Sequence, residues 1–203
     1  MALFFNIDNN FKEAKIIFFD SRVQGIKFDV YDDFTVIRDE NFNVASINIF
    51  SNVIKKENKN FGYLTANENN KLKEKILSKN SKYKFTEINY FLVGKITKRE
   101  SHPKSDKLFV LLVDFGAETK QIITNTLYTT VGKYFVWCQP GSITASGLEI
   151  VESEIMGEKS YGMLCSSDSL GLSTGEKEKL DVFLNNANDN YLGKEIFELL
   201  DFD

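Results

Sequence analysis

Five short stretches rich in β-branched and aromatic residues follow one another in the second half of the chain. Glycine, proline and serine separate most of these stretches, as expected where a backbone turns sharply. Strands of this length and spacing are typical of a small closed β-barrel or a β-sandwich. The sequence therefore predicts strands at 88–100, 107–116, 120–124, 133–138 and 148–155.

The first part of the chain also favours short strands, followed by one helix. Leu72 and Ile76 recur at helical spacing within residues 64–80, which predicts the helix. Thr65 or Asn67 can cap its N-terminus with a side-chain oxygen. The strands expected before this helix are at 4–7, 14–20, 25–32, 34–39 and 43–54.

These patterns predict a mainly β protein with two domains. A boundary is expected near residues 79–86, where the helical pattern ends and the strand pattern resumes. A chain of 203 residues has room for one large domain or two small ones. The predicted domains are a small α/β N-terminal domain at 1–80 and a barrel-like C-terminal domain at 87–203.

Charge and cysteine content limit the function. A formal net charge of −4 argues against strong, indiscriminate nucleic-acid binding, so an RNA site has to be a local patch. Cys138 and Cys165 form no CxxC pair, which favours a cytoplasmic chain with free thiols. The single histidine, His102, excludes His-rich zinc sites.

The hydropathy pattern gives no reason to expect a membrane protein. No apolar run approaches the roughly 20 residues that span a bilayer. The apolar start MALFFNIDNN has no basic region and no small-residue cleavage site. We therefore expect a first strand there rather than a signal peptide.

Two polar stretches mark places where strands end. SHPKSDKL (101–108) predicts a tight turn, which is either a solvated hairpin loop or a phosphate contact made by Lys104 and Lys107. WCQPGS (137–142) contains a Pro-Gly pair after a strand. Its simplest interpretation is a structural corner.

A third stretch, GEKSYGMLCSSDSLGL (157–172), is rich in small residues. It is either a generic Gly/Ser loop or a surface on which the backbone approaches a ligand closely. In the second case Ser160, Ser166 and Ser167 would donate hydrogen bonds to a phosphate or a base edge. Met163 would offer a soft apolar contact to a base or ribose.

Taken together, these stretches resemble one family of RNA-binding domains. In order and spacing, HPKSDKL, VDFG, QII, VGKYFVWCQPGS and GEKSYGMLCSSDSLGL resemble the tRNA-binding domain at the N-terminus of the bacterial phenylalanyl-tRNA synthetase β subunit. The same domain occurs in free-standing tRNA-binding proteins and in the endothelial-monocyte-activating polypeptide. The resemblance covers about residues 88–203, and residues 180–203 resemble the strand, loop and G-x-x-[IL] ending of the synthetase-type domain. SINIFS (46–51) before a helix resembles the YtpR-type proteins, in which a small α/β domain precedes the barrel.

The resemblance implies an OB fold for the C-terminal domain, which is a five-stranded, partly open Greek-key barrel. It also implies tRNA binding largely through shape and backbone, without reading an anticodon. We expect no cofactor and no metal. The chain departs from the family at Tyr128, which replaces an asparagine, and at Met156, which replaces an arginine. Four glutamates on the way to the last motif would repel phosphate if they lined the binding groove: Glu149, Glu152, Glu154 and Glu158.

We therefore predict a non-catalytic tRNA-binding protein whose basic residues attract the RNA backbone. Its predicted partner is tRNA or another structured RNA. An aminoacyl-tRNA synthetase is a further candidate partner, and a homodimer stays open because some relatives dimerise through this domain. The candidate RNA-binding residues are Lys95, Lys98, Arg99, His102, Lys104, Ser105, Lys107, Ser160, Met163 and Ser166.

Two other classes of function compete with this prediction. The same barrel can dock a synthetase or another protein after losing RNA binding, which the negative net charge, Tyr128 and Met156 favour. An enzyme is not expected, because the chain has no GxGxxG or Walker phosphate loop. A nucleophilic Cys165 would have only His102 as an imidazole partner.

Overall fold

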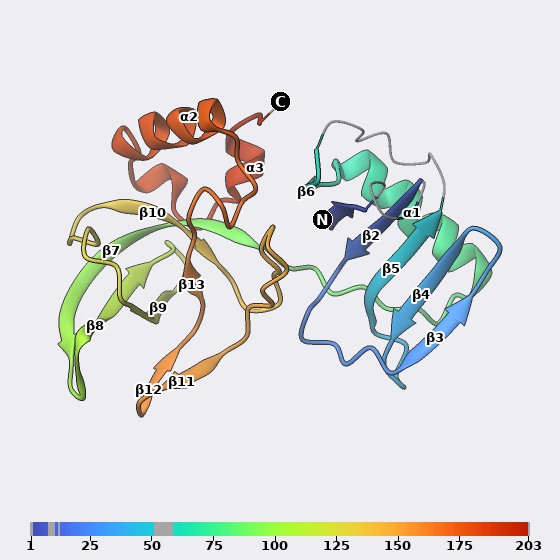
Figure 1. Ribbon diagram of the computed structural model, residues 1–203, viewed down its shortest axis with the longest axis horizontal. Helices are drawn as coiled ribbons and strands as arrows, with labels where there is room; N and C mark the ends of the chain where they lie inside the picture. The colour runs from blue at the N-terminus through green and yellow to red at the C-terminus, as the bar shows by residue number, and fades with distance from the viewer. Residues whose placement is uncertain (1, 8–10, 12, 51–58, 203) are drawn as a thin grey trace. The chain divides into compact units, whose positions relative to one another are not determined.

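Antiparallel strands dominate the structure, so the mainly β fold class is confirmed. Figure 1 shows the helices and strands of this computed structural model. Among the residues that it describes, no helix is long and apolar enough to cross a membrane. The described residues are 2–7, 11, 13–50 and 59–202.

The chain divides into two compact units. The N-terminal unit comprises Met1–Ile88 and Gly141–Glu149, and the C-terminal unit comprises Asn89–Pro140 and Ile150–Asp203. A short segment late in the sequence therefore belongs to the first unit. The predicted domain bounds given above stay predictions.

A six-stranded antiparallel sheet forms most of the N-terminal unit, and α1 (Ala66–Lys79) lies against one of its faces (Figure 1). The strand order is β3-β4-β5-β2-β1-β6. Ile17 pairs with Ile47 on the helix-covered face, and both are buried in one core with Leu72 and Ile76 of α1. The strands are β1 (Leu3–Asn6), β2 (Ala14–Phe18), β3 (Lys27–Val30), β4 (Phe34–Arg38), β5 (Val44–Phe50) and β6 (Phe61–Tyr63).

The helix of this unit begins where the sequence predicts. The Glu68 N–H donates to the Thr65 hydroxyl at 3.2 Å, and the Thr65 N–H donates to the Glu68 carboxylate at 2.8 Å. This capping box satisfies backbone donors that the first helical turn leaves unpaired. The sequence does not predict β6. The predicted strand 43–54 is confirmed as far as Phe50, and its last four residues lie outside the described residues.

In the C-terminal unit, five strands form an antiparallel sheet in the order β13-β10-β7-β8-β9. The sheet closes on itself at the segment between β12 (Glu158–Ser160) and β13. There the Tyr161 N–H donates to the Gln121 carbonyl of β9 at 2.9 Å, and the Ile123 N–H donates to the Ser160 hydroxyl at 3.1 Å. The result is a small barrel of the OB type. Its strands are β7 (Phe91–His102), β8 (Ser105–Asp114), β9 (Thr119–Thr124), β10 (Tyr134–Cys138) and β13 (Met163–Leu164).

The barrel interior is filled around the single tryptophan. Leu111, Val113, Ile122 and Trp137 are fully buried in one cluster. The indole N–H of Trp137 donates to the Gly94 carbonyl at 3.0 Å. A Cβ at Gly94 would lie 2.7 Å from Val113 and 2.8 Å from Trp137, so only glycine lets β7 pass so close to the indole.

The predicted strand 148–155 is only partly correct. The strand β11 starts at Ser153, ends at Ile155 and pairs with β12 in a separate hairpin. Glu149 makes only an isolated bridge to Ile143. The residues before Ser153 therefore lack the continuous ladder of hydrogen bonds that defines a strand.

The strand predicted within residues 180–203 is wrong, because this segment begins in the helix α2 (Thr174–Asn185). Ser173 and Glu176 form a capping box, in which the Ser173 N–H donates to the Glu176 carboxylate at 2.7 Å. The cap starts a helix, and the buried Leu180 anchors it. A 3₁₀ turn, η1 (Asp189–Tyr191), and a short helix, α3 (Ile196–Leu199), follow.

Candidate nucleic-acid interface

Two turns that carry the sequence motifs lie together in the C-terminal unit. His102 ends β7, and its Nε2 lies 3.0 Å from the carbonyl oxygen of Ile155 at the end of β11. The Lys104 N–H donates to Nδ1 of the same ring at 3.1 Å, so Nε2 is the nitrogen that donates to Ile155. His102 is only 4 % exposed, so it is a buried residue that connects the two turns by hydrogen bonds rather than a surface group.

Lys104 lies against the second turn. A Cβ added to Gly157 would be 2.8 Å from Lys104 Nζ, which shows how close the ammonium group is to the β11–β12 hairpin. Met156 and Gly157 both have left-handed backbone conformations, with φ of 52° and 93°. A tight turn of this kind exposes its backbone. We refer to the β7–β8 turn and the β11–β12 turn as the joined turns.

The joined turns present two unpaired ammonium groups. Lys104 and Lys107 are exposed, and neither forms an ion pair among the residues that the structure describes. The Lys107 N–H donates to the Ser105 hydroxyl at 3.3 Å, so Ser105 helps to shape the turn.

Three other predicted cations have partners within the protein. Lys95 pairs with Asp189 at 2.9 Å, and Lys98 pairs with Glu100 at 2.9 Å. The Arg99 guanidinium lies 3.5 Å from the centre of the Phe109 ring. The structure therefore does not gather all five predicted cations into one unpaired patch.

The ion pair of Lys95 is reinforced by a tyrosine. Hydrogen bonds from Tyr134 and then Lys95 lower the pKa of the Asp189 carboxyl. The hydrogen bond to Asp189 raises the pKa of Lys95. Lys95 and Asp189 therefore both stay charged at neutral pH and form a stable ion pair.

The residues of the third motif lie in different settings. Ser160 is 2 % exposed, and its hydroxyl closes the barrel by accepting the Ile123 N–H of β9 at 3.1 Å, while it donates to the Gly162 carbonyl at 3.1 Å. Met163 is half-buried on β13, opposite Cys138. Ser166 is exposed, and its hydroxyl lies 3.0 Å from that of Ser169. Only Ser166 among the three predicted contacts offers a fully exposed polar group.

The glutamates near the last motif lie largely in solvent. Glu149, Glu152 and Glu154 are exposed. Glu154 lies opposite Lys159 in the β11–β12 hairpin, and the Gln121 side chain donates to Glu158 at 3.2 Å. A cross-strand lysine therefore offsets part of the negative charge on the hairpin next to the joined turns.

The sequence did not indicate that the two cysteines meet. Their sulfur atoms lie 2.7 Å apart where β10 pairs with β13. Burial raises the pKa of the Cys165 thiol well above its usual value, and the Cys138 thiol adds to the effect. Among the described residues, no group of three or more His, Cys, Asp and Glu side chains is placed to hold a metal ion.

The sequence also does not predict that the β7–β8 turn and the β11–β12 turn contact each other. His102 and Ile155 are 53 residues apart, and a contact at that separation depends on barrel closure. The one local signal is Gly157, since glycine suits the left-handed conformation of a tight turn. A cleft beside α2, described below, was likewise not predicted.

Comparison with known proteins agrees with this geometry. Residues 91–188 match the family described as "Putative tRNA binding domain". The chain is 38 % identical over 89 residues to the "Putative tRNA-binding protein YtpR" of Bacillus subtilis, covering 44 % of this chain and 44 % of the relative. It is 39 % identical over 80 residues to the phenylalanine–tRNA ligase β subunit of Campylobacter jejuni, covering 39 % of this chain and 10 % of the relative.

A crystal structure of a MetRS-related protein from Pyrococcus horikoshii is also similar, with 28 % identity and a TM-score of 0.31. That match covers 37 % of this chain and 66 % of the solved one. The chain thus matches less than half the length of the YtpR and ligase relatives. The family model itself matches residues 91–188, which lie within the C-terminal unit apart from the segment Gly141–Glu149.

Proposed function

We propose that the chain binds tRNA through its C-terminal unit, without catalysing a reaction. The observation that carries the proposal is the contact between His102 and Ile155, which makes one surface of two motifs that are far apart in sequence. Lys104 and Lys107 are exposed on that surface and have no ion-pair partner among the described residues. The family match over residues 91–188 supports the choice of RNA.

The chemistry of the surface fits a folded backbone better than a base sequence. An ammonium group contacts phosphate as a point charge and carries no sequence information. The β7–β8 turn places the two lysines three residues apart, so the surface favours phosphates that lie near each other. Binding should therefore depend on the folded shape of the RNA and on salt.

The proposal also includes a non-catalytic role and an aminoacyl-tRNA synthetase as a further partner. The relative from Bacillus subtilis is named for tRNA binding and not for a reaction, which supports a non-catalytic role. The ligase β subunit of Campylobacter jejuni carries a similar domain, which supports a synthetase as a further partner. A cytoplasmic location and a homodimer stay predictions.

A competition experiment tests the shape dependence. Labelled tRNA bound to the protein is challenged with unlabelled folded tRNA or with an unstructured RNA of equal length. We expect folded tRNA to compete at a concentration at least tenfold lower. Equal competition by the two RNAs would point to a general oligonucleotide binder instead.

An exposed edge strand favours a second candidate function, docking of another protein. The strand β3 is at the end of the N-terminal sheet, and Ile26, Phe28 and Val30 in and before it are 53 %, 64 % and 76 % exposed. Natural proteins usually protect such an edge, because its unpaired backbone invites another strand. A pull-down after nuclease treatment tests this function. Partners that bind the native protein but not Phe28→Lys would support it, and the absence of any such partner would argue against it.

A further inference from the structure

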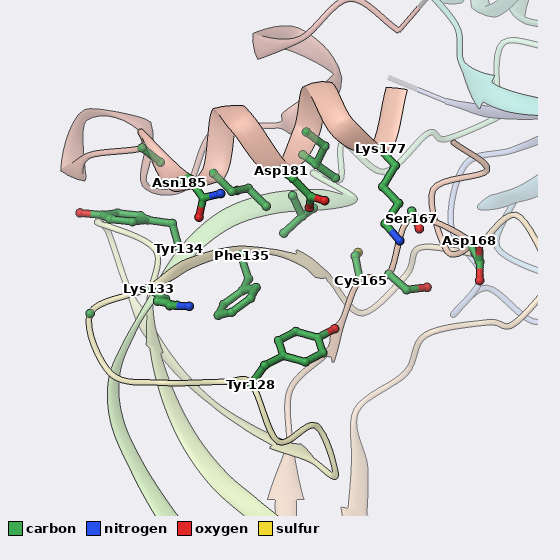
Figure 2. A pocket seen from close by; sticks show the side chains of 16 residues that line it. Tyr128, Lys133, Tyr134, Phe135, Cys165, Ser167, Asp168, Lys177, Asp181 and Asn185 are labelled. Atoms are coloured by element: carbon green, nitrogen blue, oxygen red, sulfur yellow. The ribbon is translucent and has the colours of Figure 1, made fainter. Parts of the chain in front are cut away.

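A cleft of about 730 Å³ lies between α2 and β10 in the C-terminal unit (Figure 2). The turn between β9 and β10 borders it below, and the segment after β13 borders it on the right in this view. Small-molecule sites typically measure about 300–1,000 Å³. Of the candidate RNA-binding residues, only Ser166 lines the cleft, so it is a separate site from the joined turns.

Two aromatic rings lie next to each other in the cleft. The ring centres of Tyr128 and Phe135 are 6.0 Å apart and inclined at 44°. Tyr128 is 61 % exposed, and its hydroxyl makes no hydrogen bond to any residue that the structure describes. RNA-binding proteins stack unpaired bases on exposed aromatic rings of this kind.

The charged groups of the cleft balance one another. Lys133 and Lys177 are exposed, and within the described part of the chain neither forms an ion pair. Asp168 and Asp181 also line the cleft, and Asp181 follows Lys177 by one helical turn on α2. Because the two ammonium groups and two carboxylates cancel, a simple polyanion would gain little here.

A nucleotide matches this combination. Its phosphate accepts hydrogen bonds from a lysine, and its ribose hydroxyls or exocyclic amino group donate to a carboxylate. Its base has a flat face for Tyr128. The helix α2 covers one side of the cleft (Figure 2), so a base would have to leave its stack in order to enter.

We propose that this cleft binds one unpaired nucleotide of a structured RNA, with the base stacked on Tyr128 and the phosphate held by Lys177. The inference rests on the proposed function, because the joined turns would supply the attachment to the rest of the RNA. The cleft adds a preference for a free end or an extruded base. That preference can be measured separately from overall RNA binding, as the difference in affinity between RNAs with and without an unpaired nucleotide.

The test compares two RNA hairpins with the same stem, one blunt and one with a four-nucleotide single-stranded 3′ extension. Fluorescence anisotropy gives their affinities for the full-length protein. The extended hairpin should bind about 5- to 150-fold more tightly, which corresponds to stacking of one base. Tyr128→Leu should abolish this advantage, and Tyr128→Phe, which keeps the ring, should retain it.

Lysine variants separate the cleft from general charge effects. Lys177→Gln should reduce the advantage of the extended hairpin. Lys71→Gln removes an exposed lysine on α1 and should leave the advantage unchanged. Equal affinity of the native protein for the two hairpins would overturn the cleft assignment, and continued binding of the blunt hairpin would leave the proposed function standing.

A mononucleotide tests the cleft even if neither hairpin binds. Adenosine monophosphate titrated into ¹⁵N-labelled protein should shift the amide signals of Gly132 and Ser167, which line the cleft. The same titration of Tyr128→Leu should leave those signals in place. If the native protein shows no shift, the cleft assignment is wrong whatever the outcome with tRNA.

Discussion

The imidazole of His102 lies 3.0 Å from the carbonyl oxygen of Ile155, although 53 residues separate them in the sequence. The ring also accepts a hydrogen bond from the Lys104 backbone, so one side chain sets the positions of both joined turns. This places His102 in a positioning role beside the proposed RNA contacts. Its burial explains why it is not itself a phosphate contact.

A substitution of His102 should therefore weaken RNA binding indirectly. His102→Ala removes both ring contacts and lets Lys104 move relative to the β11–β12 hairpin. We expect tRNA affinity to fall while the salt dependence stays close to that of the native protein, because both lysines remain. Filter binding at several salt concentrations measures both quantities. A salt dependence that flattens as much as in a lysine variant would contradict the positioning role.

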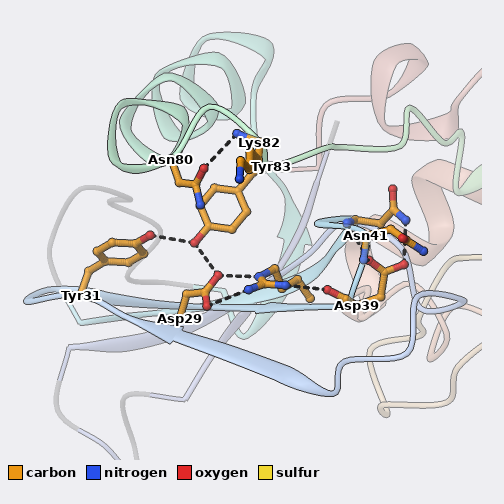
Figure 3. A network of polar contacts seen from close by, with 9 residues as sticks. Asp29, Tyr31, Asp39, Asn41, Asn80, Lys82 and Tyr83 are labelled. Atoms are coloured by element: carbon orange, nitrogen blue, oxygen red, sulfur yellow. Dashed lines mark hydrogen bonds and ion pairs between the residues drawn. The ribbon is translucent and has the colours of Figure 1, made fainter.

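The second prediction concerns a polar network in the N-terminal unit (Figure 3). The Arg38 guanidinium donates two hydrogen bonds to Asp29, at 2.5 and 3.1 Å, and the Tyr83 hydroxyl donates a third at 2.7 Å. The hydrogen bond from Arg38 lowers the pKa of Asp29, and that from Tyr83 adds to the effect. Burial and the hydrogen bonds to Tyr31 and Asp29 raise the pKa of Tyr83.

The free energy of unfolding of the N-terminal unit should therefore decrease at acidic pH. A carboxyl whose pKa is lowered by folding contributes stability above about pH 4, and this contribution is lost as pH falls through the folded pKa. Asp29→Asn should lower the free energy of unfolding by about 1–3 kcal/mol at pH 7. The deficit should shrink at pH 3. Urea unfolding at both pH values measures it, with the exposed Asp32→Asn as a control that should change little.

The third prediction concerns the attachment of the C-terminal tail to the barrel. The buried Glu195 carboxylate accepts hydrogen bonds from the N–H groups of Tyr90 and Phe91, at 2.7 and 3.0 Å. Glu195→Ala would remove the carboxylate that accepts from both buried N–H groups and should cost about 2 kcal/mol or more. Glu195→Gln keeps one acceptor oxygen and should cost less. Equal unfolding free energies for the native protein and Glu195→Ala, measured in urea, would show that the tail is held by other contacts.

The fourth prediction concerns the thiols. Only a thiolate reacts with disulfide reagents, and burial raises the pKa of Cys165. In Cys138→Ser, where Cys165 is the one remaining cysteine, labelling at pH 8 should be at least tenfold slower in the folded protein than in urea. Similar rates in the two states would mean that the thiol is accessible and ionised as in a free peptide.

Local sequence patterns predict most of the strands, because the residues that specify a strand lie within it and in the turns beside it. Alternating apolar residues and turn residues specify β2, β5, β7 and β8 without reference to the rest of the chain. The helix α2 was missed although its signal is present. Ser173 and Glu176 form the S-x-x-E pattern of a capping box, whereas the family resemblance of residues 180–203 implies a strand there.

The candidate site was predictable only in part. Lys104 and Lys107 come from one motif, so their proximity follows from the sequence. The partner of Lys95 does not follow in the same way, because Asp189 is 94 residues away. The contact between Cys138 and Cys165 depends on the register of β10 with β13, which no local pattern reveals.

The most direct test of the account is the salt dependence of tRNA binding by the double variant Lys104→Ala, Lys107→Ala. If both ammonium groups neutralise phosphates, the variant should bind more weakly, and its slope of log K against log salt should be shallower by about 2. The matched double variant Lys95→Ala, Lys98→Ala, whose lysines are paired within the protein, should change the slope much less. An affinity and a slope identical to those of the native protein would contradict the assignment of the joined turns as the RNA-binding surface.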